Sequence, residues 1–198
     1  MIMDIDLLLT WGATYKKVKA GEIIFWEGAQ ASFYYQLVSG SVKWVSINEE
    51  GKEFIQIMIE ESESFGELPL FDDDPYAATA IAAQDSVLIR LHKSTFLQLL
   101  REQPEIHFNF TKLLSQRMRY KFLTIKELAH YSPEHMISSL LQYFKQHKMH
   151  TCPDSNRVKL TRQQIADLTG LRVETVIRAM RHLHSEGKLV IEKGKVYC

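Results

Sequence analysis

Residues 161–178 read TRQQIADLTGLRVETVIR and hold the densest local signals of the 198-residue chain. Thr161 and Gln164 have the spacing of a capping box, so a helix is predicted to begin here. Gly170 stands where a tight turn between two helices needs a positive φ angle. A second helix is predicted over residues 172–185, because apolar residues recur there every three or four positions. These periodic apolar residues are Val176, Ala179, Met180 and Leu183.

The segment after this second helix favours a β-hairpin. Gly187 is predicted to end the helix, and residues 189–197 read as two short strands that turn at Lys193-Gly194. A helix, a glycine turn, a second helix and a hairpin in this order form a winged helix-turn-helix. Two structurally packed helices would use the same glycine, but they would not require the polar helix face described next.

The second helix carries polar side chains near its N-terminus, and we predict that they contact double-stranded DNA. Arginine can donate two hydrogen bonds to guanine, and glutamate can accept one from cytosine. The residues predicted from their position on this face are Arg172, Glu174, Thr175, Arg178 and Arg181. From residue 157 onward, 9 lysines and arginines stand against 4 acidic residues, a net charge of +5 that can neutralise phosphates. A nucleoid-type binder with little sequence preference is disfavoured, because a glutamate in the groove costs affinity unless it meets cytosine.

The charge of the remaining chain has the opposite sign. Residues 1–103 contain 8 lysines and arginines against 16 acidic residues, a net charge of −8, although the whole chain is neutral. Such asymmetry indicates two modules, of which the basic one faces a polyanion. The alternative is two solvated surfaces of different charge.

The sequence pattern of residues 15–91 is typical of an all-β domain. Short β-like runs alternate with glycine, asparagine and aspartate turns, which favours a β-sandwich or barrel. The predicted strands cover residues 22–26, 33–38, 41–47, 53–59, 79–83 and 87–91.

Helical patterns follow this β region. Ser94 is predicted to cap a short helix that reaches Arg101, and Pro104 begins a long one that reaches Ala129. Ser132, followed by Pro133, is predicted to cap another helix that ends near residue 146. Residues 147–156 read as a polar linker.

The long helix has two apolar stripes. The first contains Ile106, Phe110, Leu113, Arg117, Tyr120 and Thr124, and the second contains Leu114, Met118, Phe122, Ile125 and Ala129. Two stripes need two partners, and the simplest second partner is the same helix of another chain, so a homodimer is predicted. The alternative is that one chain buries both stripes.

These patterns predict an α+β protein with three parts. Residues 1–103 form a β-roll of the jelly-roll type, residues 104–130 form a dimerisation helix, and residues 131–198 form the winged helix-turn-helix domain. No apolar run approaches the ~20 residues that cross a bilayer, and the first residues are acidic. With only two cysteines, the chain is expected in the reducing cytoplasm and not in a membrane.

Five blocks of sequence resemble the Crp/Fnr family, the regulators related to the cyclic-AMP receptor protein and the fumarate-nitrate regulator. The blocks are residues 33–42, 50–53, 65–71, 161–166 and 171–178, and the match runs through nearly the whole chain. The resemblance implies a cyclic-nucleotide-binding-like sensor roll, a dimerisation helix and binding to a palindromic operator. It implies that Glu174 and Arg178 read a TGA-like half-site and that Val173 is a further specificity position. Ile177 departs from the serine that the fumarate-nitrate regulators carry.

The resemblance also adds Thr161 and Arg162 to the predicted DNA contacts, with RNA polymerase as a further candidate partner. In the sensor domain it places a ligand pocket at Gly66, Glu67, Leu68, Ala77, Ala78, Lys121 and Phe122. The family's nucleotide binders hold the ribose at the glutamate and the cyclic phosphate at an Arg-Ser pair, which here is Ala77-Ala78. The expectation is therefore a sensor without cofactor that does not bind cyclic AMP in the usual way and that takes an unknown small effector or none. A cyclic-nucleotide-responsive regulator is the alternative.

Enzyme and metal functions are disfavoured by the positions of histidine and cysteine. A cupin-like metal enzyme needs histidines on adjacent strands, but the first histidine of the chain is His92. His147, His150 and Cys152 lack a fourth ligand and are interpreted as a surface cluster. Trp11, Trp26 and Trp44 are interpreted as core or pocket wall. No catalytic residue and no metal ligand is predicted.

Overall fold

The fold is known from a computed structural model that describes residues 3–130 and 132–198, with the backbone alone for residues 128–130. The chain divides into two compact units, Met1–Gln116 and Arg117–Cys198, and the division falls within the long helix α4 (Pro104–His130). In the described part of the chain, no helix is both long enough and apolar enough to cross a bilayer.

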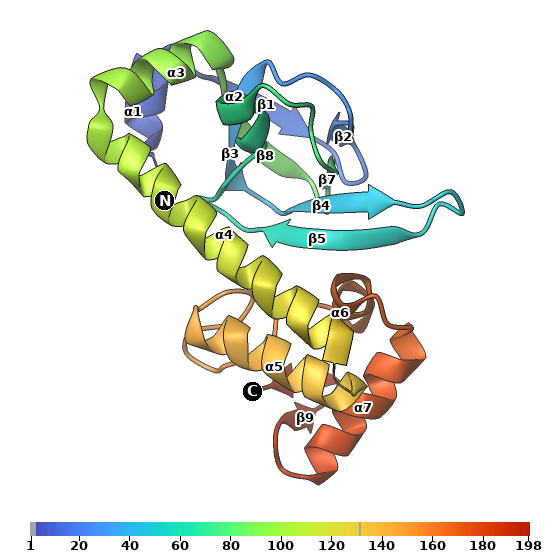
Figure 1. Cartoon of the computed structure of the whole chain (residues 1–198). Coiled ribbons are helices and arrows are strands. Elements are labelled where there is room, and N and C mark those ends of the chain that lie inside the picture. The colour runs from blue at the N-terminus through green and yellow to red at the C-terminus, as the bar shows by residue number, and fades with distance from the viewer. Residues whose placement is uncertain (1–2, 131) are drawn as a thin grey trace. The chain divides into compact units, whose positions relative to one another are not determined.

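The first unit is a roll of two antiparallel four-stranded sheets (Figure 1). The strand orders are β1-β8-β3-β6 and β2-β7-β4-β5. The strands are β1 (Thr14–Val18), β2 (Ile23–Phe25), β3 (Phe33–Ser39), β4 (Val42–Ile47), β5 (Glu53–Ile59), β6 (Ser64–Phe65), β7 (Thr79–Ala82) and β8 (Ser86–His92). The predicted sandwich and its six strands are confirmed. Strands β1 and β6 were not predicted, because β1 is largely exposed and β6 has only two residues.

Side chains of β3 and β8 alternate between two hydrophobic clusters, as successive residues of a strand must. Tyr35 and Leu37 lie in the inner cluster between the sheets, which also contains Phe25, Phe65, Tyr76 and Leu88. Tyr34 and Ile89 lie in the outer cluster, with Leu8, Leu91, Phe96 and Phe110. The sheet that contains β3 and β8 is therefore covered on both faces.

Helices α1 (Ile5–Thr10), α3 (Lys93–Glu102) and the start of α4 supply the outer cluster, and α2 (Leu68–Asp72) adds Leu70. The Tyr34 and Phe96 rings stack with centroids 4.8 Å apart. Helix α3 was predicted to be capped by Ser94, but its N-cap is His92, whose ring nitrogen accepts from the backbone N–H of Ser94. His92 itself has extended backbone angles at the end of β8, which lets its ring turn back to the start of α3.

The second unit contains the rest of α4, α5 (Pro133–Gln146), α6 (Arg162–Thr169), α7 (Val173–Ser185) and the hairpin β9 (Val190–Glu192) and β10 (Lys195–Tyr197). The predicted Ser132 cap is confirmed, since its side chain accepts from the backbone N–H of His135. Tyr120 of α4 packs on α5, 5.4 Å from the Tyr143 ring centroid, and burial raises its pKa to about 12.

The predicted polar linker over residues 147–156 is exposed at both ends, but His150 and Thr151 in its middle are buried. His150 is 3% exposed and meets the Phe144 ring edge-on at 4.8 Å between centroids. Thr151 is also buried and forms a β-bridge with Val158. The interpretation of His150 as part of a surface cluster is wrong, because an aromatic ring of α5 covers the imidazole.

Candidate nucleic-acid interface and sensor site

The turn between α6 and α7 is built by the residues that the sequence singled out. The Thr161 hydroxyl accepts from the backbone N–H of Gln164 at 3.1 Å, and the Gln164 side chain accepts from the N–H of Thr161 at 2.8 Å. Gly170 has φ 69°, a left-handed conformation that lets α6 end abruptly. The predicted capping box and turn are confirmed.

Helix α7 separates buried apolar residues from exposed polar ones. Its buried residues are Val176, Ala179, Met180 and Leu183, as the sequence predicts. Its exposed face carries the polar side chains predicted to contact DNA, namely Arg172, Glu174, Arg178 and Arg181. Because residues four apart lie on one side of a helix, Glu174 and Arg178 share this face.

Three of the other predicted DNA contacts are less exposed, whereas Thr161 is exposed. Val173 and Thr175 are half-buried at the start of α7, and the Thr175 hydroxyl accepts from Arg178 Nη2 at 3.5 Å. Arg162 is half-buried as the first residue of α6. The Thr161 hydroxyl already serves as the cap, so a phosphate contact from this residue would share that oxygen.

The wing is held to α7 by a contact that the sequence analysis missed. His184 Nδ1 lies 3.2 Å from the carbonyl oxygen of Leu189, across the loop that leads into β9. The predicted turn is confirmed, since Lys193 and Gly194 have φ angles of 45° and 78°. Both positive angles match the two-residue hairpin turn that suits twisted strands.

In the first unit, the predicted pocket residues around Gly66 lie on a densely packed aromatic core. Gly66 has φ 73°, and a Cβ there would lie 3.0 Å from the Phe25 ring. Both the backbone angle and the close ring therefore favour glycine at this position. The Tyr76 ring stacks on Phe25 with centroids 3.7 Å apart. Glu67 is fully buried, whereas Leu68 is 39% exposed on α2.

The structure gives no cation at the positions where the family holds a cyclic phosphate. Ala77 is exposed and Ala78 is buried just before β7. In the adjoining acidic loop, Asp73 pairs with Lys93 at 2.6 Å. This pair leaves the loop with a net negative charge.

Lys121 and Phe122 belong to the second unit. Burial lowers the pKa of Lys121 to about 8. Phe122 is 64% exposed.

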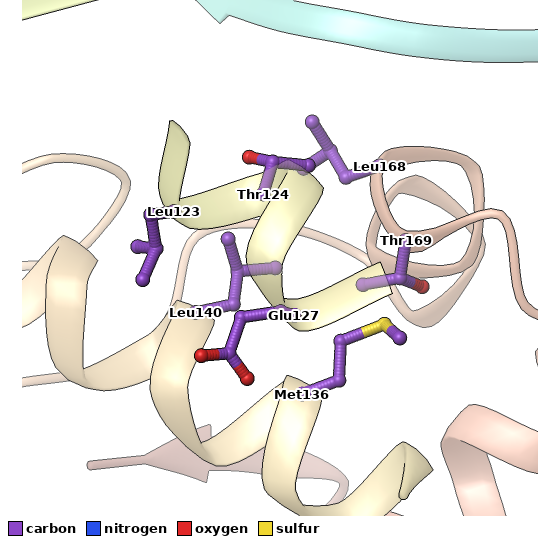
Figure 2. Close-up of a pocket in the computed structure, with 7 residues that line it drawn as sticks. All are labelled: Leu123, Thr124, Glu127, Met136, Leu140, Leu168 and Thr169. Carbon is purple, nitrogen blue, oxygen red and sulfur yellow. The ribbon is translucent and has the colours of Figure 1, made fainter. Parts of the chain in front are cut away.

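The described residues of the second unit enclose a small cavity and line a larger groove. The first, of about 10 Å³, has the size of one water and is lined by α4, α5 and α6. Figure 2 shows its lining residues Leu123, Thr124, Glu127, Met136, Leu140, Leu168 and Thr169. The Glu127 carboxylate lies 3.5 Å from His135 Nε2. The second is a groove of about 420 Å³ beside α5 and the end of α7.

Of the tryptophans interpreted as core or pocket wall, one packs against the core and another is largely exposed. Trp44 packs against the inner cluster, but Trp26 is 57% exposed and is not a core residue, because it follows the last residue of β2 in a turn. Within residues 3–130 and 132–198, no three histidine, cysteine or acidic side chains are grouped as a metal site requires.

Two family models match this sequence. Residues 15–103 match the cyclic nucleotide-binding domain, and residues 134–197 match the Crp-like helix-turn-helix domain. Among curated proteins, the cAMP-activated global transcriptional regulator CRP of Haemophilus influenzae is 28% identical over 96% of this chain and 89% of its own.

Solved structures show the same fold. FixK2 from Bradyrhizobium japonicum superposes with a TM-score of 0.79 at 19% identity, covering 93% of this chain and 91% of that one. The catabolite activator protein of Thermus thermophilus has a TM-score of 0.57 at 25% identity, covering 98% and 88%.

Proposed function

The chain belongs to the Crp/Fnr family of transcriptional regulators, and from this premise we propose that it binds a palindromic operator as a homodimer. The observation that carries the proposal is helix α7. It buries four apolar residues on one side and presents arginines around a glutamate on the other. This arrangement suits a helix that enters the major groove with its N-terminus.

In this proposal some exposed side chains of α7 contact base edges and others contact phosphates. Arg178 donates to a guanine, and Glu174, one turn earlier, accepts from the amino group of a cytosine. Arg172 and Arg181 contact phosphates at the groove edges. Val173, at the first helical position, packs against a base and sets a further preference, while Thr161 and Arg162 contact the backbone from α6.

The dimer proposal is supported by an uncovered stripe on α4. Met118, Phe122 and Ile125 are 59%, 64% and 62% exposed, and they recur at spacings of four and three residues. A second copy of the helix would bury this stripe as a coiled-coil seam. Leu114 extends the stripe, whereas the side chain of Ala129 lies outside the described residues.

For the sensor domain we propose an effector other than cyclic AMP held in the usual way. The support is the absence of a cation at Ala77 and Ala78 and the acidic loop beside them. A cyclic-nucleotide-responsive regulator remains the second candidate, since the sensor domain matches the cyclic nucleotide-binding domain and a 28% identical relative is named cAMP-activated.

The family consists of transcriptional regulators, and we propose no catalytic activity for this chain. The proposed partners are double-stranded DNA, a second copy of the chain and RNA polymerase. We also propose a cytoplasmic location, where a regulator of this kind would meet DNA and RNA polymerase.

The test is binding of the full chain to a duplex with two inverted TGA triplets whose centres lie about one helical turn apart. The control duplex keeps the composition but scrambles both triplets. We expect at least about 10³-fold preference for the palindrome, in the range of specific binding. Equal affinity for both duplexes would contradict the proposal that α7 makes sequence-specific contacts with bases.

A further inference from the structure

The inner face of the roll carries an arginine, Arg90 of β8. Its neighbours Ile89 and Leu91 belong to the outer cluster, so Arg90 lies on the opposite face, with Leu88 of the inner cluster. The guanidinium carbon lies over the Phe33 ring, 4.6 Å from its centroid. Tyr35 of β3 is directly opposite Arg90 in the strand register.

The Nε of Arg90 has no hydrogen-bond acceptor among the described residues. This nitrogen is buried, and no carboxylate in the described part of the chain pairs with the guanidinium. A buried charged donor without an acceptor costs free energy, so such a group calls for a physical explanation. The Phe33 ring contacts the flat face of the guanidinium, which leaves the fork of N–H groups at its edge for an acceptor.

Tyr35 lies opposite Arg90, and Tyr76 interacts with Tyr35 in the same inner cluster. Burial raises the pKa of Tyr35, and the charge of Arg90 opposes that rise. Burial also raises the pKa of Tyr76, with a further contribution from Tyr35. Both hydroxyls therefore stay protonated at neutral pH and can donate hydrogen bonds. Phe33 and Phe65 flank Tyr35, with ring centroids 6.2 and 5.4 Å from its own.

We propose that Arg90 is the anion-binding residue of the sensor roll and that its ligand is a small carboxylate with an aromatic body. A planar carboxylate matches the Arg90 fork with two hydrogen bonds, and Tyr35 can donate to the same group. A single charge costs less to desolvate among aromatic rings than a phosphate dianion does. The proposal rests on the sensor role proposed for this domain. Its cation is on β8, apart from the Ala77-Ala78 positions.

The experiment follows the Arg90 Nε–Hε resonance in the ¹⁵N-labelled full chain, assigned by its loss in Arg90→Gln. Benzoate is the probe, and benzamide is a neutral molecule of nearly the same shape. Sodium chloride keeps the ionic strength constant. We expect benzoate to shift the Arg90 resonance saturably and to raise the Tm, whereas benzamide does neither.

Variants separate a site from a general salt effect. In Arg90→Gln, at least about ten times more benzoate should be needed for the same rise in Tm, because a charge-assisted pair is lost. Tyr35→Phe should weaken the benzoate response less, because only one donor is removed. Arg101→Gln removes an exposed arginine of the same unit and should leave the benzoate response unchanged.

Several results would overturn the proposal. They are an unchanged benzoate response in Arg90→Gln, an equal response to benzamide, and no saturable shift with benzoate. A shift with cyclic AMP or inorganic phosphate but not with benzoate would refute the carboxylate assignment. DNA binding of the wild-type chain is measured separately, so loss of operator binding counts against the proposed function and not against this site.

Discussion

Arg178 is the residue whose chemistry separates sequence-specific binding from electrostatic binding. It is exposed on α7, and within the described part of the chain its hydrogen-bond partner is the Thr175 hydroxyl, at 3.5 Å. Such a weak internal contact leaves the guanidinium fork available to a base edge.

Replacing Arg178 with alanine should cost about 1–3 kcal/mol of binding free energy on the operator and relax the preference at one base pair. Fluorescence anisotropy on the operator and on single-base variants measures both effects. Arg181→Ala is the matched control and should weaken binding to all duplexes alike. If Arg178→Ala also weakens all duplexes alike, its side chain contacts phosphate.

Lys121 gives the stability of the chain a pH dependence of known sign. Burial lowers its pKa in the folded state to about 8 from the model-peptide value of 10.5. Between these values the unfolded chain binds more protons, so the Lys121 contribution to the free energy of unfolding rises with pH. Below pH 8 the penalty for burying the charge is fully present.

Lys121→Met should therefore stabilise the chain at pH 7 and have a smaller effect at pH 10. Urea unfolding at both pH values, at constant ionic strength, measures the difference between wild type and variant. Lys126→Met removes a lysine at an exposed position of the same helix and serves as the matched control. A Lys121→Met effect of equal size at both pH values would contradict the assignment.

At the scale of single elements, the helix-turn-helix depends on its capping box. Thr161→Ala should lower the free energy of unfolding by about 1 kcal/mol, because the N–H of Gln164 loses its acceptor. Chemical denaturation measures the loss. Thr161→Ser keeps the hydroxyl and should restore most of the stability, and equal losses in both variants would show that the methyl group matters instead.

The elements that could be predicted carry their own local signals. Ser132, Thr161 and Gly170 fix helix ends through caps and a positive φ angle, which depend on neighbouring residues alone. Strand β1 could not be predicted, because its lysines hide the alternation and its edge position follows from pairing with distant β8. The burial of His150 likewise depends on Phe144 and on the bridge to Val158.

The candidate site shows the same division. The exposed polar face of α7 follows from helical periodicity, so the residues on it could be predicted from the sequence, whereas their contacts with DNA stay a prediction. The position of Arg90 against Phe33 follows from strand register between β3 and β8, which no local pattern reveals. The contact between His184 and Leu189 depends on how the loop folds back.

At the scale of the whole molecule, the proposed binding to a palindromic operator requires two copies of the chain. Ile125→Glu places a carboxylate in the exposed apolar stripe of α4 and should shift the chain from dimer to monomer in sedimentation velocity. Gln116→Glu adds the same charge at another exposed position of the helix and should leave the dimer intact. A dimer that tolerates Ile125→Glu would place the interface elsewhere.

The most direct test of the central claim is selection of bound duplexes from a random library by the full chain, with and without cyclic AMP. We predict an enriched palindrome with TGA-like half-sites about 34 Å apart, present in both selections. A palindrome that appears only with cyclic AMP would contradict the proposed sensor. Enrichment of no sequence in either selection would contradict the reading role of α7.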